Sequence, residues 1–376
     1  MGFRPFFILA TLAGIILPVL WAQIFNGVMA PPTHSFAAIR WHAHEMYFGF
    51  GLAVLGGFLL TATKNWVKVR GFYGRYLIFL VFAWLFERIG MFFGGNWPPI
   101  LFVISNYMFL ATLILMLLWT LIKNRKTDSY KDNILFILIL PLFLISKYFM
   151  LSLDYFELGT SLSNGLFRIA FLIMLERTLT QFMKNTFQVQ ILRNFILDTS
   201  IKLFAFCLLL DKLLVPKISS AMILILTLLL CLRFIFWKPR WAFRRLDIGI
   251  MYLGYLALVL QLFLMFLSRI QHWHLVGSVI THVFTMGVMG LIIPAMMIRI
   301  CNGHTGRKVN FDRRDKAVLK IMMLAFIFRV VAPQFFAAQY VVFIYAAALC
   351  WLAGFLLLAG RYIPILLEPR IDGKES

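Results

Sequence analysis

Long apolar runs, separated by short polar or charged breaks, recur along the whole chain. A helix needs roughly 20 apolar residues to cross about 30 Å of hydrocarbon, and most of the runs reach that length. We therefore predict an all-α, polytopic membrane protein. About twelve transmembrane helices are expected over residues 6–25, 40–63, 76–94, 100–122, 133–150, 162–183, 196–214, 218–237, 247–268, 273–299, 317–337 and 340–362.

Two of these segments are weaker than the rest. The segment 133–150 is short, and the segment 196–214 is interrupted by charged residues. No connection between the segments is long enough to bury a core of its own, so a separate soluble domain is not expected. We predict a single transmembrane domain over residues 1–376.

The composition excludes several classes of protein. Apolar residues make up 62% of the chain and charged residues 14%, with a mean hydropathy of +0.88, whereas soluble domains average about 45–50% and about 25%. A soluble enzyme, a disordered chain and a disulfide scaffold are therefore excluded. The four cysteines are far apart and form no CxxC pair, which argues against a thiolate metal site. Pro31 and Pro32 follow the first apolar run in place of a small-residue cleavage site, so no cleavable signal is expected.

The net charge of +21 would suggest nucleic acid as a partner of a soluble protein. Here the basic residues gather in the connections on one side of the predicted helices, 27 of them against five on the other side. Lys and Arg are enriched in cytoplasmic loops, so both termini are predicted to be cytoplasmic. The lipid bilayer is the expected partner, and nucleic acid is not. The five residues on the outer side are Arg40, Lys147, Lys212, Lys217 and Arg269.

Histidines gather near the outer ends of two predicted helices. His42 and His44 begin the second helix, and His272, His274 and His282 lie in the outer part of the tenth. Two helices that present imidazoles at one face of a membrane provide what a bis-histidine haem or a copper site needs. Histidines at a membrane interface without any such role are the alternative.

Helical geometry separates the first two histidines. Successive residues of a regular helix turn by about 100°, so His42 and His44 point about 200° apart and cannot chelate one metal. Small residues share the His42 side and allow a backbone or a flat macrocycle to approach, although ordinary helix packing explains them equally. His44 and Glu45 face a different neighbour. On the tenth helix His282 shares its side with methionines, which suit copper(I) or simply fill the core.

Charged residues inside the predicted spans are a further signal, because burying them costs several kcal/mol unless they are paired. Arg88, Arg168 and Arg329 all fall in the outer half of the membrane. Three cations there could balance the two propionates of a haem. The alternatives are that Arg88 pairs with Glu87 and that the others extend toward water.

Several motifs resemble those of the NnrS family over residues 2–373. They are the opening Gly2–Phe7, the segment Trp41–Phe50, the stretch from His282 through Arg299 to Gly303–Arg307, and the tail Glu368–Gly373. The resemblance implies a twelve-span protein of the bacterial inner membrane that binds haem and copper and protects against nitric oxide and nitrosative stress. One segment departs from the family pattern: Leu175–Phe182 lacks the glycine and proline that members more often carry there.

The chain is also similar, more distantly, to subunit I of haem–copper oxidases and nitric oxide reductases. That likeness implies His42 and His282 as axial haem ligands and Arg329 in the helix that binds the propionates. No histidine lies in the sixth and seventh predicted helices, and Ile280 stands where a second histidine of the tenth is expected. The copper triad of the oxidases is thus missing, and proton-pumping oxygen reduction is not expected.

Taken together, the resemblances imply haem b held by His42 and His282, with the three intramembrane arginines balancing its charge. Copper would use His44, Glu45, His272 or His274, besides the two haem candidates. Nitric oxide would be the ligand, and an unidentified electron donor would supply electrons. A bis-histidine iron has no open position, so a relay or sensor suits it better than a reductase, and catalysis stays open. A transporter whose buried arginines and histidines line a substrate or proton path is the alternative.

Overall fold

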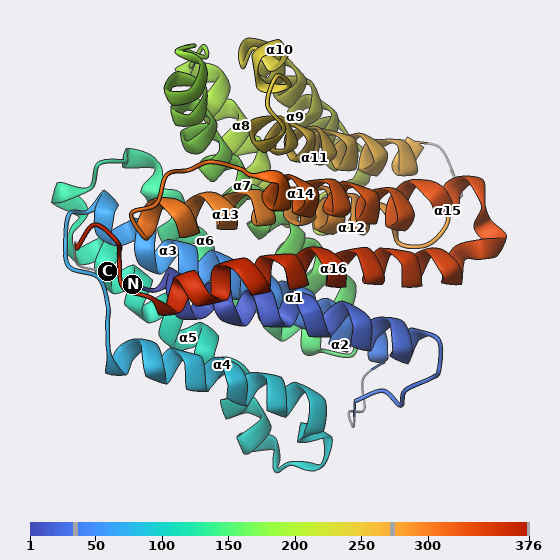
Figure 1. Cartoon of the computed structure of the whole chain (residues 1–376). Coiled ribbons are helices and arrows are strands. Elements are labelled where there is room, and N and C mark those ends of the chain that lie inside the picture. The colour runs from blue at the N-terminus through green and yellow to red at the C-terminus, as the bar shows by residue number, and fades with distance from the viewer. Residues whose placement is uncertain (33–36, 271–274, 374–376) are drawn as a thin grey trace. The chain divides into compact units, whose positions relative to one another are not determined.

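The structure, a computed structural model, describes residues 1–32, 37–270 and 275–373, and every regular element in these ranges is a helix (Figure 1). This confirms the predicted all-α class. The main elements are α1 (Phe3–Phe25), α2 (Ala38–His44), η1 (Glu45–Gly51), α3 (Leu52–Trp66), α4 (Arg75–Phe93), α5 (Pro99–Lys123), α6 (Ile134–Leu151), α7 (Phe156–Phe187), α8 (Phe195–Cys207), α9 (Pro216–Phe236), α11 (Leu246–Ile270), α12 (Val279–His282), η6 (Val283–Met289), α13 (Gly290–His304), α14 (Arg313–Phe326), η7 (Ile327–Val331), α15 (Ala332–Phe335) and α16 (Tyr340–Leu367).

Within the described ranges, eleven helical stretches are long and apolar enough to cross a membrane, so the chain is a multi-pass membrane protein. Their bounds follow the predicted segments closely. The predicted seventh span is the exception: α8 has 13 residues and is continued only by the short 3-10 helix η5 (Leu208–Leu210). The sixth is longer than predicted, because α7 begins at Phe156. Gly159 allows this close start, since a Cβ there would overlap the backbone of Met150.

The described chain divides into two compact units. Unit 1 comprises residues 1–163, 300–309 and 355–376, and unit 2 comprises residues 164–299 and 310–354. The prediction of one transmembrane domain therefore stays a prediction.

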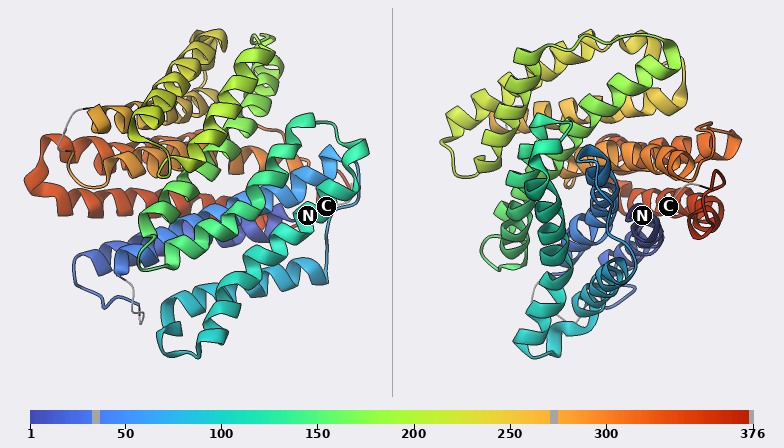
Figure 2. Two further views of the ribbon diagram at one scale, coloured as in Figure 1. Left: turned by 180° about the vertical axis from the view of Figure 1, so that it is seen from behind. Right: turned by 90° about the vertical axis from the view of Figure 1, so that its left-hand side faces the viewer.

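In unit 1, α1 packs along α3 and α4 packs along α5. Two glycines let other helices approach α3: a Cβ at Gly57 would lie 2.7 Å from Phe6 Cβ of α1, and one at Gly56 would lie 2.7 Å from Leu113 of α5. Small residues at helix contacts serve this purpose in membranes. The two termini lie at the same end of this unit (Figure 2), and Arg4 Nη1 donates to the Leu366 carbonyl (2.9 Å). This agrees with the prediction that both termini share one side.

In unit 2, α11 packs against α9 and against η6. Small residues again bring helices together: a Cβ at Gly287 would lie 2.6 Å from Ala257 Cβ, and one at Gly254 would overlap Ile292. The helix α8 packs on α9 beside them.

Three of the spans contain a π-helical segment: η1, η6 and η7. A π turn holds about one residue more than an α turn, so it shifts the direction of every side chain beyond it. The prediction of which residues share a helix side with His42 and with His282 assumed regular α-helices. That assumption is therefore wrong beyond these π-helical segments. Single π turns are frequent at functional sites. Here His42 and His282 each precede one, and Arg329 lies inside another.

Candidate functional site

Unit 1 contains a buried group of ionisable side chains, which we call the unit-1 ion cluster: His44, Glu45, Glu87, Arg88 and Lys147. They come from α2, η1, α4 and α6. The side chains of His44, Glu87 and Lys147 are fully buried, and that of Arg88 is 12% exposed. A membrane interior would not tolerate these charges singly, so their value to the fold depends on how they pair.

Glu87 lies at the centre of the unit-1 ion cluster. Its Oε1 accepts from Lys147 Nζ, lies 2.6 Å from Arg88 Nη2 and lies 3.4 Å from His44 Nε2. Glu45 completes the cluster: its Oε2 accepts from Arg88 Nη1 (3.0 Å), and its Oε1 lies 3.2 Å from His44 Nδ1. The two carboxylates thus lie among the side chains of a lysine, an arginine and a histidine. The pairing of Arg88 with Glu87 is present, with Glu45 added.

Lys147, counted among the five basic residues of the outer side, is fully buried. A lysine near the end of an apolar segment usually extends toward water. Instead its ammonium group donates to the Asn106 carbonyl and lies over the rings of Phe48 (5.4 Å) and Tyr107 (5.5 Å). No signal in the sequence indicates that α6 presents this residue to Glu87.

Gly49 of η1 makes room for the cluster, because a Cβ at this position would overlap Arg88 Nη1. We expect Gly49→Ala to destabilise the protein by about 1–3 kcal/mol through overpacking, measured as the unfolding midpoint in detergent. Gly360→Ala is the matched control, since a Cβ there meets nothing within 4 Å and alanine favours a helix. Equal midpoints for the two variants would contradict this account of Gly49.

His42 and His44 point toward different neighbours, as the helical geometry predicted. The ring of His42 stacks on Trp21 of α1, with centroids 4.3 Å apart and planes at 10°. Both ring nitrogens of His44 face carboxylates in the unit-1 ion cluster. Such surroundings favour a ring that donates from both nitrogens, whereas a metal ligand offers a lone pair.

In unit 2, His282 is the last residue of α12 and bonds back to its own turn. Its Nδ1 lies 2.9 Å from the Ser278 carbonyl and 3.0 Å from the Ser278 hydroxyl. Because a carbonyl only accepts, the contact favours a proton on Nδ1 and a lone pair on Nε2. Metal-binding histidines are commonly oriented by a hydrogen bond of this kind.

Arg168 and Arg329, the two arginines of unit 2 that were predicted to balance haem propionates, contact neutral groups. Arg168 Nη2 donates to Gln261 Oε1 (3.2 Å) and lies 3.6 Å from Met265 Sδ. Arg329 Nη1 donates to the Tyr340 hydroxyl (3.2 Å), and its guanidinium lies 5.5 Å from the centre of that ring. Over the residues that the structure describes, Arg329 forms no ion pair with a carboxylate. A positive charge held in this way suits an anionic ligand.

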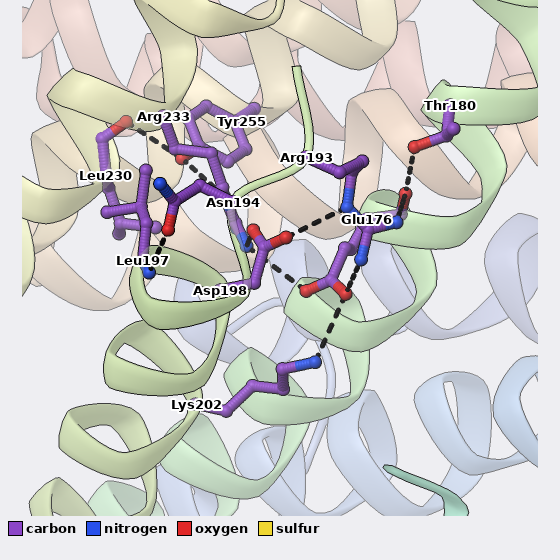
Figure 3. A network of polar contacts seen from close by, with 10 residues as sticks. All are labelled: Glu176, Thr180, Arg193, Asn194, Leu197, Asp198, Lys202, Leu230, Arg233 and Tyr255. Carbon is purple, nitrogen blue, oxygen red and sulfur yellow. Dashed lines mark hydrogen bonds and ion pairs between the residues drawn. The ribbon is translucent and has the colours of Figure 1, made fainter. Parts of the chain in front are cut away.

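A second polar network, the unit-2 ion cluster, joins Glu176, Arg193, Asp198, Lys202 and Arg233 (Figure 3). Glu176 Oε1 accepts from Arg193 Nη2 and from Lys202 Nζ (3.1 Å), while its Oε2 lies 3.5 Å from Arg233 Nη1. Asp198 Oδ2 accepts from Arg193 Nε (2.8 Å). Glu176 belongs to the segment Leu175–Phe182, which departs from the family pattern. This departure was the one feature of the sequence that pointed to the unit-2 ion cluster.

Of the copper ligands predicted from sequence, His44 and Glu45 lie 3.2 Å apart in the unit-1 ion cluster. His272 and His274 lie outside the described residues. In the remainder of the chain, no three His, Cys, Asp or Glu side chains are grouped so that they could hold a metal ion. The copper site stays a prediction.

Comparison with known proteins confirms the family resemblance. A family model described as NnrS protein matches residues 1–370, essentially the whole chain. No curated protein matches the sequence.

Proposed function

The chain belongs to the NnrS family, which is associated with the response to nitric oxide, and we propose that it is a haem-binding protein of the bacterial inner membrane that protects against nitrosative stress. We further propose copper as a second cofactor and nitric oxide as the small-molecule ligand, with an electron donor still to be identified.

The observation that carries the proposal is the hydrogen bond of His282. A ring that donates from Nδ1 to the Ser278 carbonyl offers its Nε2 lone pair in a fixed direction. In the same unit, Arg329 carries a positive charge without a carboxylate among the described residues. An imidazole and a cation of this kind fit a haem, whose iron needs a nitrogen ligand and whose propionates need positive charge. Bound haem would supply an iron that binds nitric oxide or passes an electron.

The protein's own residues would orient and balance that group. Ser278 holds the ring of His282 through its carbonyl, and Trp21 holds the ring of His42 by stacking. Arg329 and Arg168 would offer charge-assisted hydrogen bonds to propionates. Arg88 is already engaged by Glu45 and Glu87, so it is the least suited of the three arginines. His42 and His282 are the proposed ligands, and each is tested by its own variant.

The test is a pyridine haemochrome spectrum with metal analysis of detergent-purified protein from haem-replete cells. We expect about one haem b per chain in the wild type, since His42 and His282 together would supply the two imidazoles for one iron. His42→Ala and His282→Ala should each lower the haem content, and the double variant should lose it. His304→Gln is the control histidine variant. Full retention of haem by the double variant would refute the assignment.

The second candidate function is a transporter, favoured by the unit-1 ion cluster. Intramembrane ionisable residues commonly mark ion or substrate pathways. The purified protein would then be colourless and metal-free, and it would support uptake of solute into proteoliposomes. Loss of this uptake in the Glu45→Gln variant would favour a transporter over a haem protein.

A further inference from the structure

A cavity of about 420 Å³ opens in unit 1 between the first two residues of the chain and residues 369–373. Its volume is within the range of small-molecule sites, about 300–1,000 Å³. None of its described lining residues is acidic. The residues that the argument uses are Met1, Gly2, Lys64, Arg70, Tyr73 and Arg370.

Basic side chains line the described part of the cavity, and two carboxylates of the C-terminal segment pair with arginines beside it. Asp372 Oδ2 accepts from Arg370 Nη2 (2.5 Å), and Glu368 Oε2 accepts from Arg307 Nη2 (2.6 Å). Arg4 instead donates to the backbone carbonyls of Leu366 and Glu368. Its Nε and Nη2 atoms are buried without a hydrogen-bond partner. Arg4 is not among the described lining residues, so its charge adds to the positive field in the cavity without contacting a bound group.

The Met1 amine also lies among these charges. Burial, together with the charges of Lys64 and Arg4, lowers the pKa of the Met1 amine to about 6. The helix α1 begins at Phe3 and points the positive end of its dipole toward this region. Cations on three segments and a helix N-terminus together favour an anion.

The cavity also lies where a membrane surface is expected. The distribution of Lys and Arg places the two termini on the cytoplasmic side. Arg70 lies over the ring of Tyr73 (4.3 Å), and Arg75 lies over that of Tyr76 (5.3 Å). Both tyrosines are exposed, at 56% and 46%. Tyrosines and basic residues of this kind are typical of the headgroup level.

We propose that this cavity binds a phosphate group, supplied by the headgroup of an anionic phospholipid or by a soluble phosphate compound. Lys64, Arg70 and Arg370 would contact the phosphate oxygens, and the charge of Arg4 would strengthen the field behind them. The inference does not rest on haem binding, and the haem content of the variants below should be unchanged.

The experiment compares three proteins by native mass spectrometry. They are the wild type, Lys64→Gln/Arg70→Gln, and a control of equal charge change, Lys68→Gln/Lys126→Gln. Both control lysines are exposed, belong to unit 1 and do not line the cavity. Each protein is titrated with phosphatidylglycerol, phosphatidylcholine and pyrophosphate. Elution as a single peak in size-exclusion chromatography verifies that each variant is folded.

If the phosphate is a headgroup, the wild type should prefer phosphatidylglycerol to phosphatidylcholine. The cavity variant should then bind phosphatidylglycerol roughly 30-fold more weakly, because each basic residue near a membrane surface contributes about fivefold. Pyrophosphate binding that is lost in the cavity variant, without a lipid preference, would support the soluble source. Equal losses in the cavity and control variants, or no binding of any probe, would overturn the proposal.

Discussion

Replacing Glu87 with leucine should destabilise the protein by about 3–5 kcal/mol, because it leaves Lys147 and Arg88 buried without their shared carboxylate. The measurement is the unfolding midpoint in a denaturant titration of the protein in mixed micelles. The matched control is Asp154→Asn, an exposed acidic residue of the same unit, which should change the midpoint little.

The double variant Glu87→Leu/Lys147→Met distinguishes a pairing effect from a packing effect. It removes one charge of each sign and leaves Glu45 paired with Arg88. Apolar replacement of a buried pair is often neutral or stabilising, so most of the lost stability should return. A double variant no more stable than Glu87→Leu would show that the pairing is not what makes Glu87 necessary.

Glu176→Gln should have an effect of similar size, about 3–5 kcal/mol, on unit 2. Glu176 contacts Arg193, Lys202 and Arg233, and the amide keeps its shape while removing its charge. Arg193 is 39% exposed and can turn to water, whereas Arg233 is 1% exposed and cannot. The loss is therefore expected to arise mainly at Arg233.

The unfolding midpoint of the whole protein, in a denaturant titration in mixed micelles, is the measurement for Glu176→Gln. Adding Arg233→Met should restore part of the stability, because it removes the cation that is left buried. The control is Glu368→Gln, which breaks an ion pair whose carboxylate side is 56% exposed and should cost at most about 1 kcal/mol. Comparable losses in Glu176→Gln and Glu368→Gln would contradict the central place of Glu176.

The helices of this protein were predictable because each depends on its own sequence. A span is recognised from apolar length alone, and this signal located even the weak segment that becomes α6. The predicted span 196–214 was overestimated for the same reason: its apolar residues continue beyond Cys207, but Asp211 and Lys212 end the helix early.

The site was predictable only in part, because its contacts join segments far apart in the chain. His42 was identified as a candidate ligand and Arg88 as a charge that is costly to bury in a membrane, and the structure gives both of them close partners. The partnership of Glu87 with Lys147 depends on how two helices face each other, which no local pattern encodes. The π turns were not predicted from the sequence either. They depend on whether each backbone N–H bonds to the carbonyl four or five residues before it.

The extra residue in each π segment makes the register of these spans adjustable. Deleting one residue from Glu45–Gly51 would let η1 relax into an ordinary α-helix. The helix would still cross the membrane, but everything on its N-terminal side would turn by about 100°. His42 would leave Trp21 and His44 would leave Glu87. The deletion of one residue would therefore change which side chains this helix presents to its neighbours, while the rest of the fold is preserved.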